Sequence, residues 1–254
     1  AADPNSTLNC IRHLGVEVER KGKKLLIRGK GIRSFRKPSS FLDCGNSGTT
    51  MRLLSGILAG QDFSSELVGD DSLSRRPMER VIVPLTKMGA RITSSSRFTS
   101  PLRIDGVGRL LPIEYELPVA SAQVKSAILL AGLYADGTTR VIEKEPTRDH
   151  TERMLGLHSE MNNGVRVTEI KGGRVLESHA FLVPGDISSA AYFIAAALLV
   201  PDSDLVLQNV GLNPTRTAFL EVLRKAGAEI SIESERVVGG EPLGDLRVKA
   251  SVLT

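Results

Sequence analysis

The sequence predicts an α/β fold built from βαβαββ repeats packed around buried helices. Two kinds of segment alternate along the 254 residues. One kind is a helix that ends at a glycine and is followed by two strands joined by a turn. The other is an apolar helix that begins at a hydroxyl-rich stretch and leads into a strand. Self-similarity on this scale indicates repeated supersecondary elements. A helix between successive strands favours parallel pairing, with a hairpin closing each repeat.

The glycine that ends each helix of the first kind marks the repeat. It stands at Gly15, Gly89, Gly164 and Gly227, at intervals of 74, 75 and 63 residues. Glycine is the usual C-cap of a helix, and alternating polarity after it is typical of a strand. We expect helices at 7–14, 80–88, 151–163 and 219–225, and hairpin strands at 15–18 with 25–27, 89–92 with 102–104, 164–167 with 174–176, and 227–232 with 246–248.

The helices of the second kind are apolar on most faces, so they should be buried. We expect them at 47–59, 121–134 and 188–199, each followed by a strand, at 65–68, 137–142 and 204–207. The chain opens inside a repeat, because the helix at 7–14 has no first half before it. We therefore count three complete repeats and one half, and we expect a fragment of a longer protein.

Composition and charge limit the classes of partner. The net charge is +4, lysines and arginines are spread along the chain, and aromatic residues are few, with no Trp and three Tyr. Nucleic-acid binding proteins usually concentrate basic and stacking residues, so a small anionic substrate is favoured over nucleic acid. No apolar run has transmembrane length and residues 1–9 lack signal-peptide character, so we expect no membrane partner.

Cys10 and Cys44 match no metal-binding or redox spacing. We expect them to be buried, reduced thiols, which favours a reducing compartment and thus the cytoplasm. No other pattern in the chain is typical of a metal site.

An anion-binding helix start is predicted around Asn46, Ser47 and Gly48. Asn and Ser are good N-caps, and Gly48 lets the backbone approach a ligand without a side chain in the way. The first N–H groups of a helix and its dipole together attract anions. A capped helix after a loop would explain the stretch on its own, and the recurrence of such starts is what favours a binding site.

Five stretches, in order along nearly the whole chain, resemble the enolpyruvyl transferases. They are LDCGNSGTTMR at 42–52, GDDSLSRRPM at 69–78, VASAQVKS at 119–126, TRDHTER at 147–153 and VPGDISSA at 183–190. The resemblance implies two similar domains, each of three βαβαββ repeats around buried parallel helices, an inside-out α/β barrel. Residues 1–183 then correspond to most of one domain, without its first half-repeat. Residues 184–254 correspond to one repeat of the other, with the boundary at Val183-Pro184-Gly185.

The resemblance implies transfer of the enolpyruvyl group from phosphoenolpyruvate to the 5-hydroxyl of shikimate 3-phosphate, with release of phosphate and without a cofactor. Two anions must be held together while charge builds in a tetrahedral intermediate, so cations and helix starts are required. The missing parts carry other binding groups of the family. We therefore expect low or no activity from this chain alone, and self-association through surfaces that the missing repeats would cover.

Two groups of binding residues follow from the resemblance. Ser121, Ala122, Gln123, Thr147 and Arg148 are expected to bind shikimate 3-phosphate, and Gly48, Arg76 and Gln123 to bind phosphoenolpyruvate, with Asn46 in support. Hydroxyl, amide and N–H groups suit a sugar phosphate, and guanidinium can grip a carboxylate or phosphate with two hydrogen bonds. Some relatives have two serines where this chain has Ser121-Ala122, so one hydroxyl contact is replaced or lost.

Several neighbours are expected to be structural or solvated. Arg52 and Lys125 lie one turn inside their helices, and Asp70 lies in a polar loop. His150 is a lone histidine of the kind that is usually satisfied or solvated. The stretch 156–163 is longer and more polar than the family's usual helix end, and we expect it to bulge from the surface.

Two alternatives stay open at this point. One is the sister enzyme that uses UDP-N-acetylglucosamine, although its usual reactive cysteine is absent from 70–74. The other is a non-catalytic fragment that retains half a binding site.

Because Gly48 has no methyl group, we also expect a complete enzyme with this loop to be inhibited by glyphosate, a phosphonate that mimics phosphoenolpyruvate.

Overall fold

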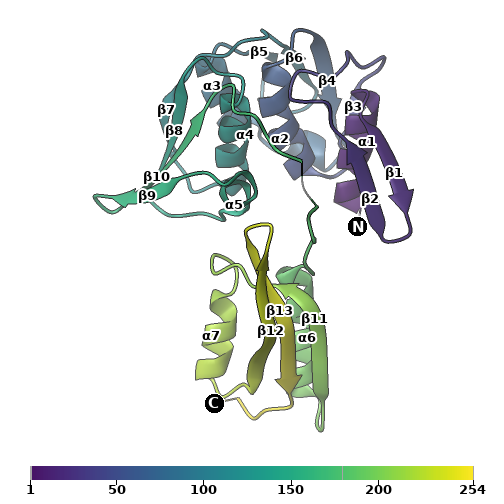
Figure 1. Cartoon of the computed structure of the whole chain (residues 1–254), viewed down its shortest axis with the longest axis vertical. Coiled ribbons are helices and arrows are strands. Elements are labelled where there is room, and N and C mark those ends of the chain that lie inside the picture. The colour runs from purple at the N-terminus through teal and green to yellow at the C-terminus, as the bar shows by residue number, and fades with distance from the viewer. Residues whose placement is uncertain (1, 179, 254) are drawn as a thin grey trace. The chain divides into compact units, whose positions relative to one another are not determined.

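Helices and strands alternate in the predicted order in the computed structural model, which describes residues 2–178 and 180–253 (Figure 1). The opening half-repeat contains α1 (Ala2–His13), β1 (Glu17–Lys21) and β2 (Lys24–Arg28). The next repeat contains β3 (Leu42–Asp43), α2 (Gly48–Ala59), β4 (Ser64–Val68), α3 (Glu79–Lys87), β5 (Arg91–Thr93) and β6 (Leu102–Asp105).

The following repeat contains β7 (Glu114–Glu116), α4 (Ala122–Gly132), β8 (Thr138–Glu143), α5 (His150–Leu155), β9 (Ser159–Asn162) and β10 (Val165–Lys171). The last contains α6 (Ile187–Leu199), β11 (Asp204–Gly211), α7 (Ala218–Lys225), β12 (Ile230–Val238) and β13 (Glu241–Lys249). An isolated parallel bridge between Gly185 and Val210 stands where the first strand of this repeat is expected.

The sheets combine parallel pairs with hairpins, as predicted. The strand orders are β3-β4-β6-β5 and β7-β8-β10-β9, and the third repeat has β11-β13-β12. In the two four-stranded sheets the first pair is parallel and the other pairs are antiparallel. This arrangement confirms the α/β fold, while closure of the helices into an inside-out barrel stays a prediction.

Backbone contacts divide the chain into two bodies. The first body comprises Ala1–Pro146 and His158–Ser178, and the second comprises Thr147–Leu157 and His179–Thr254. The short segment around α5 therefore packs with the C-terminal repeat, although the residues on both sides of it pack with the first body. The expected domains, 1–183 and 184–254, stay a prediction.

Two apolar helices form the centre of the first body. Most residues of α2 and α4 are buried, as their composition predicts. They lie so close together that a Cβ atom on Gly56 would be 2.2 Å from the carbonyl oxygen of Ala127. A glycine is therefore required at this crossing. The close packing holds the N-terminal ends of both helices in a fixed relation within this body.

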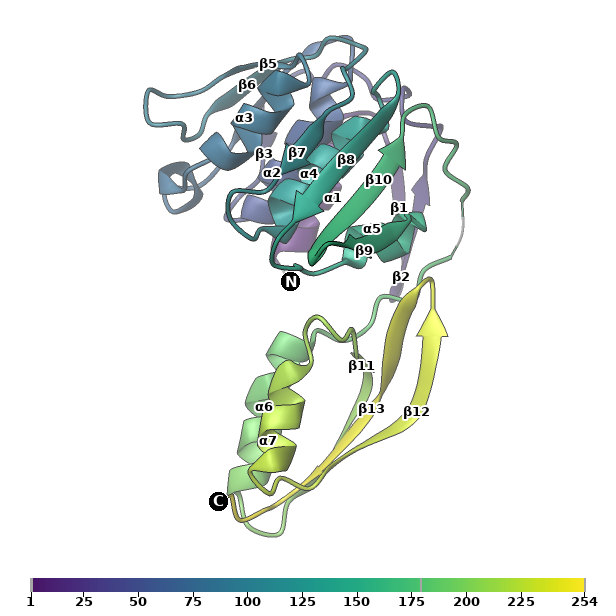
Figure 2. The same cartoon turned by 90° about the vertical axis from the view of Figure 1, so that its left-hand side faces the viewer.

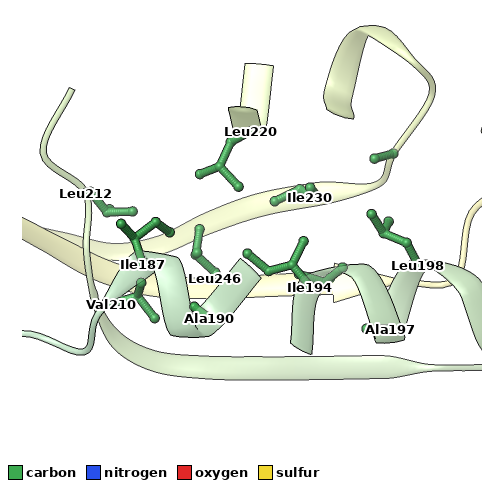
Figure 3. Close-up of a cluster of buried hydrophobic side chains, with 12 residues drawn as sticks. Ile187, Ala190, Ile194, Ala197, Leu198, Val210, Leu212, Leu220, Ile230 and Leu246 are labelled. Atoms are coloured by element: carbon green, nitrogen blue, oxygen red, sulfur yellow. The ribbon is translucent and has the colours of Figure 1, made fainter. Parts of the chain in front are cut away.

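The core of the second body lies between its sheet and its helices. Figure 2 shows α6 and α7 together on one face of the three-stranded sheet. In Figure 3 the buried side chains of α6 meet those of α7 and the strands; the cluster includes Ile187, Ala190, Ile194, Leu198, Val210, Leu220, Ile230 and Leu246. A single repeat thus builds a small apolar core of its own.

Two of the predicted elements are wrong, and both lie between residues 151 and 176. The helix expected at 151–163 ends at Leu155, because Gly156 adopts a left-handed conformation with φ of +56° and caps it. Residues 159–162 then form β9, and Asn163 and Gly164, both at positive φ, turn the chain into β10. Asn-Gly is the strongest short hairpin signal, and it outweighs the helical pattern here. The strand expected at 174–176 does not form, because β10 already pairs with β8 and β9 already forms the hairpin with β10 at the edge of the sheet.

Among the described residues, no helix has both the length and the apolar character that a membrane crossing needs.

Candidate functional site

The predicted anion site at the start of α2 is built by a side-chain cap. Ser47 is buried, and its Oγ accepts hydrogen bonds from Thr50 N at 3.1 Å and from Thr50 Oγ1 at 2.8 Å. Gly45 N donates to Asp43 Oδ1 at 2.8 Å, which orients the loop before the helix. With the cap so fixed, the first N–H groups of α2 point toward a common region, as anion binding requires.

The loop beside this helix start brings Arg76 to Asn46. Arg76 Nη2 donates to Asn46 Oδ1 at 2.5 Å, and Asn46 Nδ2 donates to Asp70 Oδ2 at 2.7 Å. Asp70 also accepts from Leu73 N at 2.8 Å, at the start of the short helix η1 (Leu73–Arg75). Hydrogen bonds from Leu73 N and Asn46 hold the pKa of Asp70 below its ordinary value. Asn46 thus connects two loops, a role that suits the supporting residue it was predicted to be.

Gly48 lies against two guanidinium groups. A Cβ atom on Gly48 would be 2.6 Å from Arg52 Nη1 and 3.4 Å from Arg76 Nη1. Burial lowers the pKa of Arg52, and the nearby charges of Arg76 and Arg80 lower it further. Because like charges repel, such a group of arginines is stabilised by a bound anion.

The hydrogen bonds of these arginines go to neutral groups. Arg52 donates to Gln123 Oε1 at 2.8 Å and to the carbonyl oxygen of Pro77 at 3.2 Å, and Arg76 donates to Asn46. Within the described part of the chain, no carboxylate forms a salt bridge with Arg52, Arg76 or Arg80. The positive charge is therefore available to a ligand.

Gln123 links this arginine group to the start of α4. It accepts from Arg52 and donates through Nε2 to Thr49 Oγ1 at 2.7 Å. Ser121 caps α4, and its Oγ accepts from Val124 N at 3.4 Å, while Ala122 is the first helical residue. The first body thus brings the predicted phosphoenolpyruvate residues and three of the predicted shikimate 3-phosphate residues together.

The other two predicted residues lie in the second body. Thr147 is half-buried and Arg148 is exposed, immediately before α5. Their contribution to the same site stays a prediction. Next to them, His150 Nδ1 lies 2.7 Å from Glu241 Oε1, whereas its Nε2 is buried and has no hydrogen-bond partner among the described residues. The expectation of a satisfied histidine therefore holds for one ring nitrogen and is wrong for the other.

Lys125 is structural, as predicted. Its Nζ lies 2.9 Å from Glu143 Oε2, and both side chains are fully buried. The ion pair joins α4 to the end of β8 one turn inside the helix start. Cys10 and Cys44 are buried and free, as expected, and the hydrogen bond with the Cys10 thiol together with burial raises the pKa of Cys44.

Sequence reasoning missed, or treated as structural, four residues that lie at or beside the arginines around Gly48: Thr49, Arg52, Asp70 and Arg80. Arg52 comes four residues after Gly48, so it lies one turn along the same helix face. Side chains on a helix lean toward its N-terminus, which brings the guanidinium back to the helix start. That spacing is a signal that could have placed Arg52 at the site.

Known proteins resemble this chain over nearly its entire length. A family model described as EPSP synthase (3-phosphoshikimate 1-carboxyvinyltransferase) matches residues 1–252. The 3-phosphoshikimate 1-carboxyvinyltransferase of Salinibacter ruber is 54% identical over 259 residues, covering 100% of this chain and 60% of that protein. Its counterpart in Bacillus subtilis is 50% identical and covers 99% of this chain and 59% of that protein.

A solved structure agrees with these sequences. EPSP synthase from Acinetobacter baumannii superimposes with a TM-score of 0.90 at 47% identity, covering 99% of this chain and 57% of that one. This chain therefore spans about 60% of the length of the curated relatives it matches. With the repeats, the helix starts and these matches in agreement, the chain belongs to the EPSP synthase family.

Proposed function

We propose that this chain carries half of a site that transfers the enolpyruvyl group of phosphoenolpyruvate to the 5-hydroxyl of shikimate 3-phosphate and releases phosphate. The observation that carries the proposal is the group formed by Gly48, Arg52 and Arg76 at the start of α2, joined by Gln123 to the start of α4. Cations and helix starts without carboxylate partners suit two anionic substrates. The names of the relatives favour this acceptor over UDP-N-acetylglucosamine.

Each predicted residue has a role in this proposal. Arg76, Arg52 and the backbone at Gly48 bind the phosphate or carboxylate of phosphoenolpyruvate, and Asn46 holds Arg76 in place. The caps and first N–H groups at Ser121, Ala122 and Gln123 bind the phosphate and hydroxyls of shikimate 3-phosphate, with Thr147 and Arg148. The positive field stabilises the charge that builds on the tetrahedral intermediate. No metal or organic cofactor takes part, and the free buried thiols support a cytoplasmic setting.

Titration of the purified chain tests the proposal. We expect weak, millimolar binding of shikimate 3-phosphate by calorimetry, and weaker binding of phosphoenolpyruvate that Arg76→Ala reduces at least about tenfold. Arg75→Ala is the matched control, since Arg75 is exposed on the same loop and donates to the carbonyl oxygen of Asp71. UDP-N-acetylglucosamine should give no heat.

The outcomes separate the parts of the proposal. No binding of shikimate 3-phosphate at millimolar concentration would exclude the half-site. Equal effects of Arg76→Ala and Arg75→Ala would exclude the arginine group as the phosphoenolpyruvate site. We expect slow or no phosphate release from the two substrates together. Steady release by the isolated chain would overturn the view that the rest of the relatives' length is needed for turnover.

A further inference from the structure

A buried polar network in the second body surrounds Asn213, which is 2% exposed. Asn213 Nδ2 donates to Asp149 Oδ1 at 2.8 Å and to Glu241 Oε2 at 3.1 Å. Asn213 Oδ1 accepts from Thr215 N at 2.9 Å and from Thr215 Oγ1 at 2.6 Å. An amide side chain has two donor hydrogens and two acceptor lone pairs, so Asn213 uses its full capacity here.

The network joins three segments that are distant in sequence. His150 Nδ1 lies 2.7 Å from Glu241 Oε1, and Arg153 forms an ion pair with Asp149 at 2.9 Å. Arg153 Nη1 also donates to the carbonyl oxygen of Gly240 at 3.3 Å. The start of α5, the loop before α7 and the start of β13 are thus held together by polar contacts, with Asn213 between the two carboxylates.

This placement explains why 147–157 packs with the second body while its neighbours in sequence pack with the first. The apolar core of the second body consists of residues from 187 onward, so it does not include α5. The polar network around Asn213 is therefore a main attachment of this segment. Thr147 and Arg148 come directly before Asp149, so their position depends on that attachment.

We propose that Asn213 is the positioning residue for Thr147 and Arg148, because it bridges Asp149 and Glu241 and so fastens the start of α5 to the second body. The side-chain amide of Asn213 donates to both carboxylates without adding a negative charge of its own, whereas a third carboxylate in its place would be repelled by them. The expected effect on ligand affinity rests on the proposed binding of shikimate 3-phosphate by Thr147 and Arg148. The expected effect on the position of residues 147–157 is independent of that proposed function.

The Asn213→Asp variant tests the attachment directly. The change keeps the shape and the acceptor for Thr215, but it places a third carboxylate beside Asp149 and Glu241. The other titratable groups that face the site are His150, Glu152 and Arg153. We expect the amides of 147–157 to exchange with deuterium at least about tenfold faster at neutral pH, with the strands β11 and β13 unchanged. Gln208→Glu, an amide-to-carboxylate change on the exposed part of β11, should leave the exchange unaltered.

A second variant keeps the test informative if Asn213→Asp unfolds the second body. Thr215→Val removes one of the two hydrogen bonds to Asn213 Oδ1 without adding charge. We expect it to speed exchange in 147–157 by a smaller factor and in no other segment. Unchanged exchange in both variants, or equally fast exchange throughout the second body in both, would overturn the proposal.

Binding of shikimate 3-phosphate is measured on the same proteins by calorimetry, with Arg148→Gln as the test of the proposed function. We expect Arg148→Gln and Asn213→Asp each to weaken binding about tenfold, and Gln208→Glu to have no effect. Weaker binding for Arg148→Gln alone would overturn the positioning role and leave the function intact. If the unaltered chain binds no shikimate 3-phosphate, the proposed function fails, and hydrogen exchange still decides whether Asn213 holds the segment.

Discussion

At Gly48 the absence of a side chain determines how close two guanidinium groups come to the start of α2. The residue has no left-handed φ, so its backbone conformation is open to any amino acid. What favours glycine is space, because Arg52 Nη1 lies 2.6 Å from the position that a Cβ atom would take. Glycine at position 48 therefore serves the arrangement of the arginines at the site more than the conformation of the helix.

Gly48→Ala should weaken the binding of phosphoenolpyruvate while leaving the fold stable. The new methyl group displaces the flexible end of Arg52 and disturbs its hydrogen bond to Gln123. We expect about tenfold weaker binding in an NMR titration. The free energy of unfolding should change by less than about 1 kcal/mol, because alanine is a better helix former than glycine.

Gly29→Ala is the matched control, since nothing lies within 4 Å of a Cβ atom there. Unchanged affinity in Gly48→Ala would show that Arg52 and the start of α2 do not contact the ligand.

At the scale of the element, α4 is held by a charge pair inside the first body. Lys125 and Glu143 are both fully buried, so the ion pair compensates two charges that have lost contact with water. The pair lies one turn from Ser121 and Gln123, and it holds the helix start against β8. A buried pair of this kind gives a geometric constraint that an apolar contact would not give.

Lys125→Met should destabilise the chain by about 3–5 kcal/mol, because it leaves the carboxylate of Glu143 buried beside an apolar side chain. Urea unfolding followed by circular dichroism measures the change. Lys144→Met is the control, because Lys144 pairs with Glu116 at 2.6 Å but the side chains are 68% and 51% exposed. Its cost should stay below about 1 kcal/mol. Similar losses in the free energy of unfolding for both variants would mean that the buried Lys125–Glu143 pair stabilises the chain no more than an exposed pair does.

The attachment of α5 should depend on pH through Asp149. Burial raises the pKa of Asp149, but hydrogen bonds from Arg153 and Asn213 outweigh it and hold the pKa below its usual value. A lowered pKa stabilises the folded state above the pKa of the unfolded chain, and this contribution is lost as pH falls through the folded value. Protection of 147–157 against hydrogen exchange should stay level from about pH 7 to 5 and fall below about pH 4.

Asp149→Asn should remove that dependence, whereas Asp71→Asn, in the exposed loop before η1, should keep it. Protection factors measured at each pH, relative to the intrinsic exchange rate, give the comparison. An acid-induced loss that persists unchanged in Asp149→Asn would assign the effect to other carboxylates.

At the scale of the whole molecule, the second body exposes one apolar face of α6. Tyr192 is 82% exposed, Leu199 is 74% exposed, and Phe193 and Val200 are exposed beside them. The opposite face of the helix fills the core shown in Figure 3. Contiguous exposed apolar side chains on a short helix favour association with another surface.

We predict that the chain self-associates through this face as its concentration rises. Tyr192→Lys should lower the apparent mass at high concentration in sedimentation velocity, because a buried charge opposes the contact. Val175→Lys, on an exposed position of the first body, is the control and should not change the mass. A monomer at all concentrations, or equal effects of the two variants, would contradict the prediction.

The order of helices and strands was predictable from the sequence because its signals are local. Caps such as Ser47 and Ser121, and glycines such as Gly89 and Gly227, act within a few residues. The same kind of signal failed where two local patterns competed, at the Asn163-Gly164 turn, and the strand expected at 174–176 was lost with it. The predicted Gly48, Arg76 and Gln123 lie together in the first body, and their binding roles stay predictions.

The tertiary structure alone decided which distant residues meet. Arg52 and Gln123 are 71 residues apart, and His150 and Glu241 are 91 apart, so no local pattern connects either pair. The packing of α2 on α4 produces the first contact, and the polar network at Asn213 produces the second. Local periodicity determines the elements, whereas burial and hydrogen-bond satisfaction over the whole chain determine which charged groups come together.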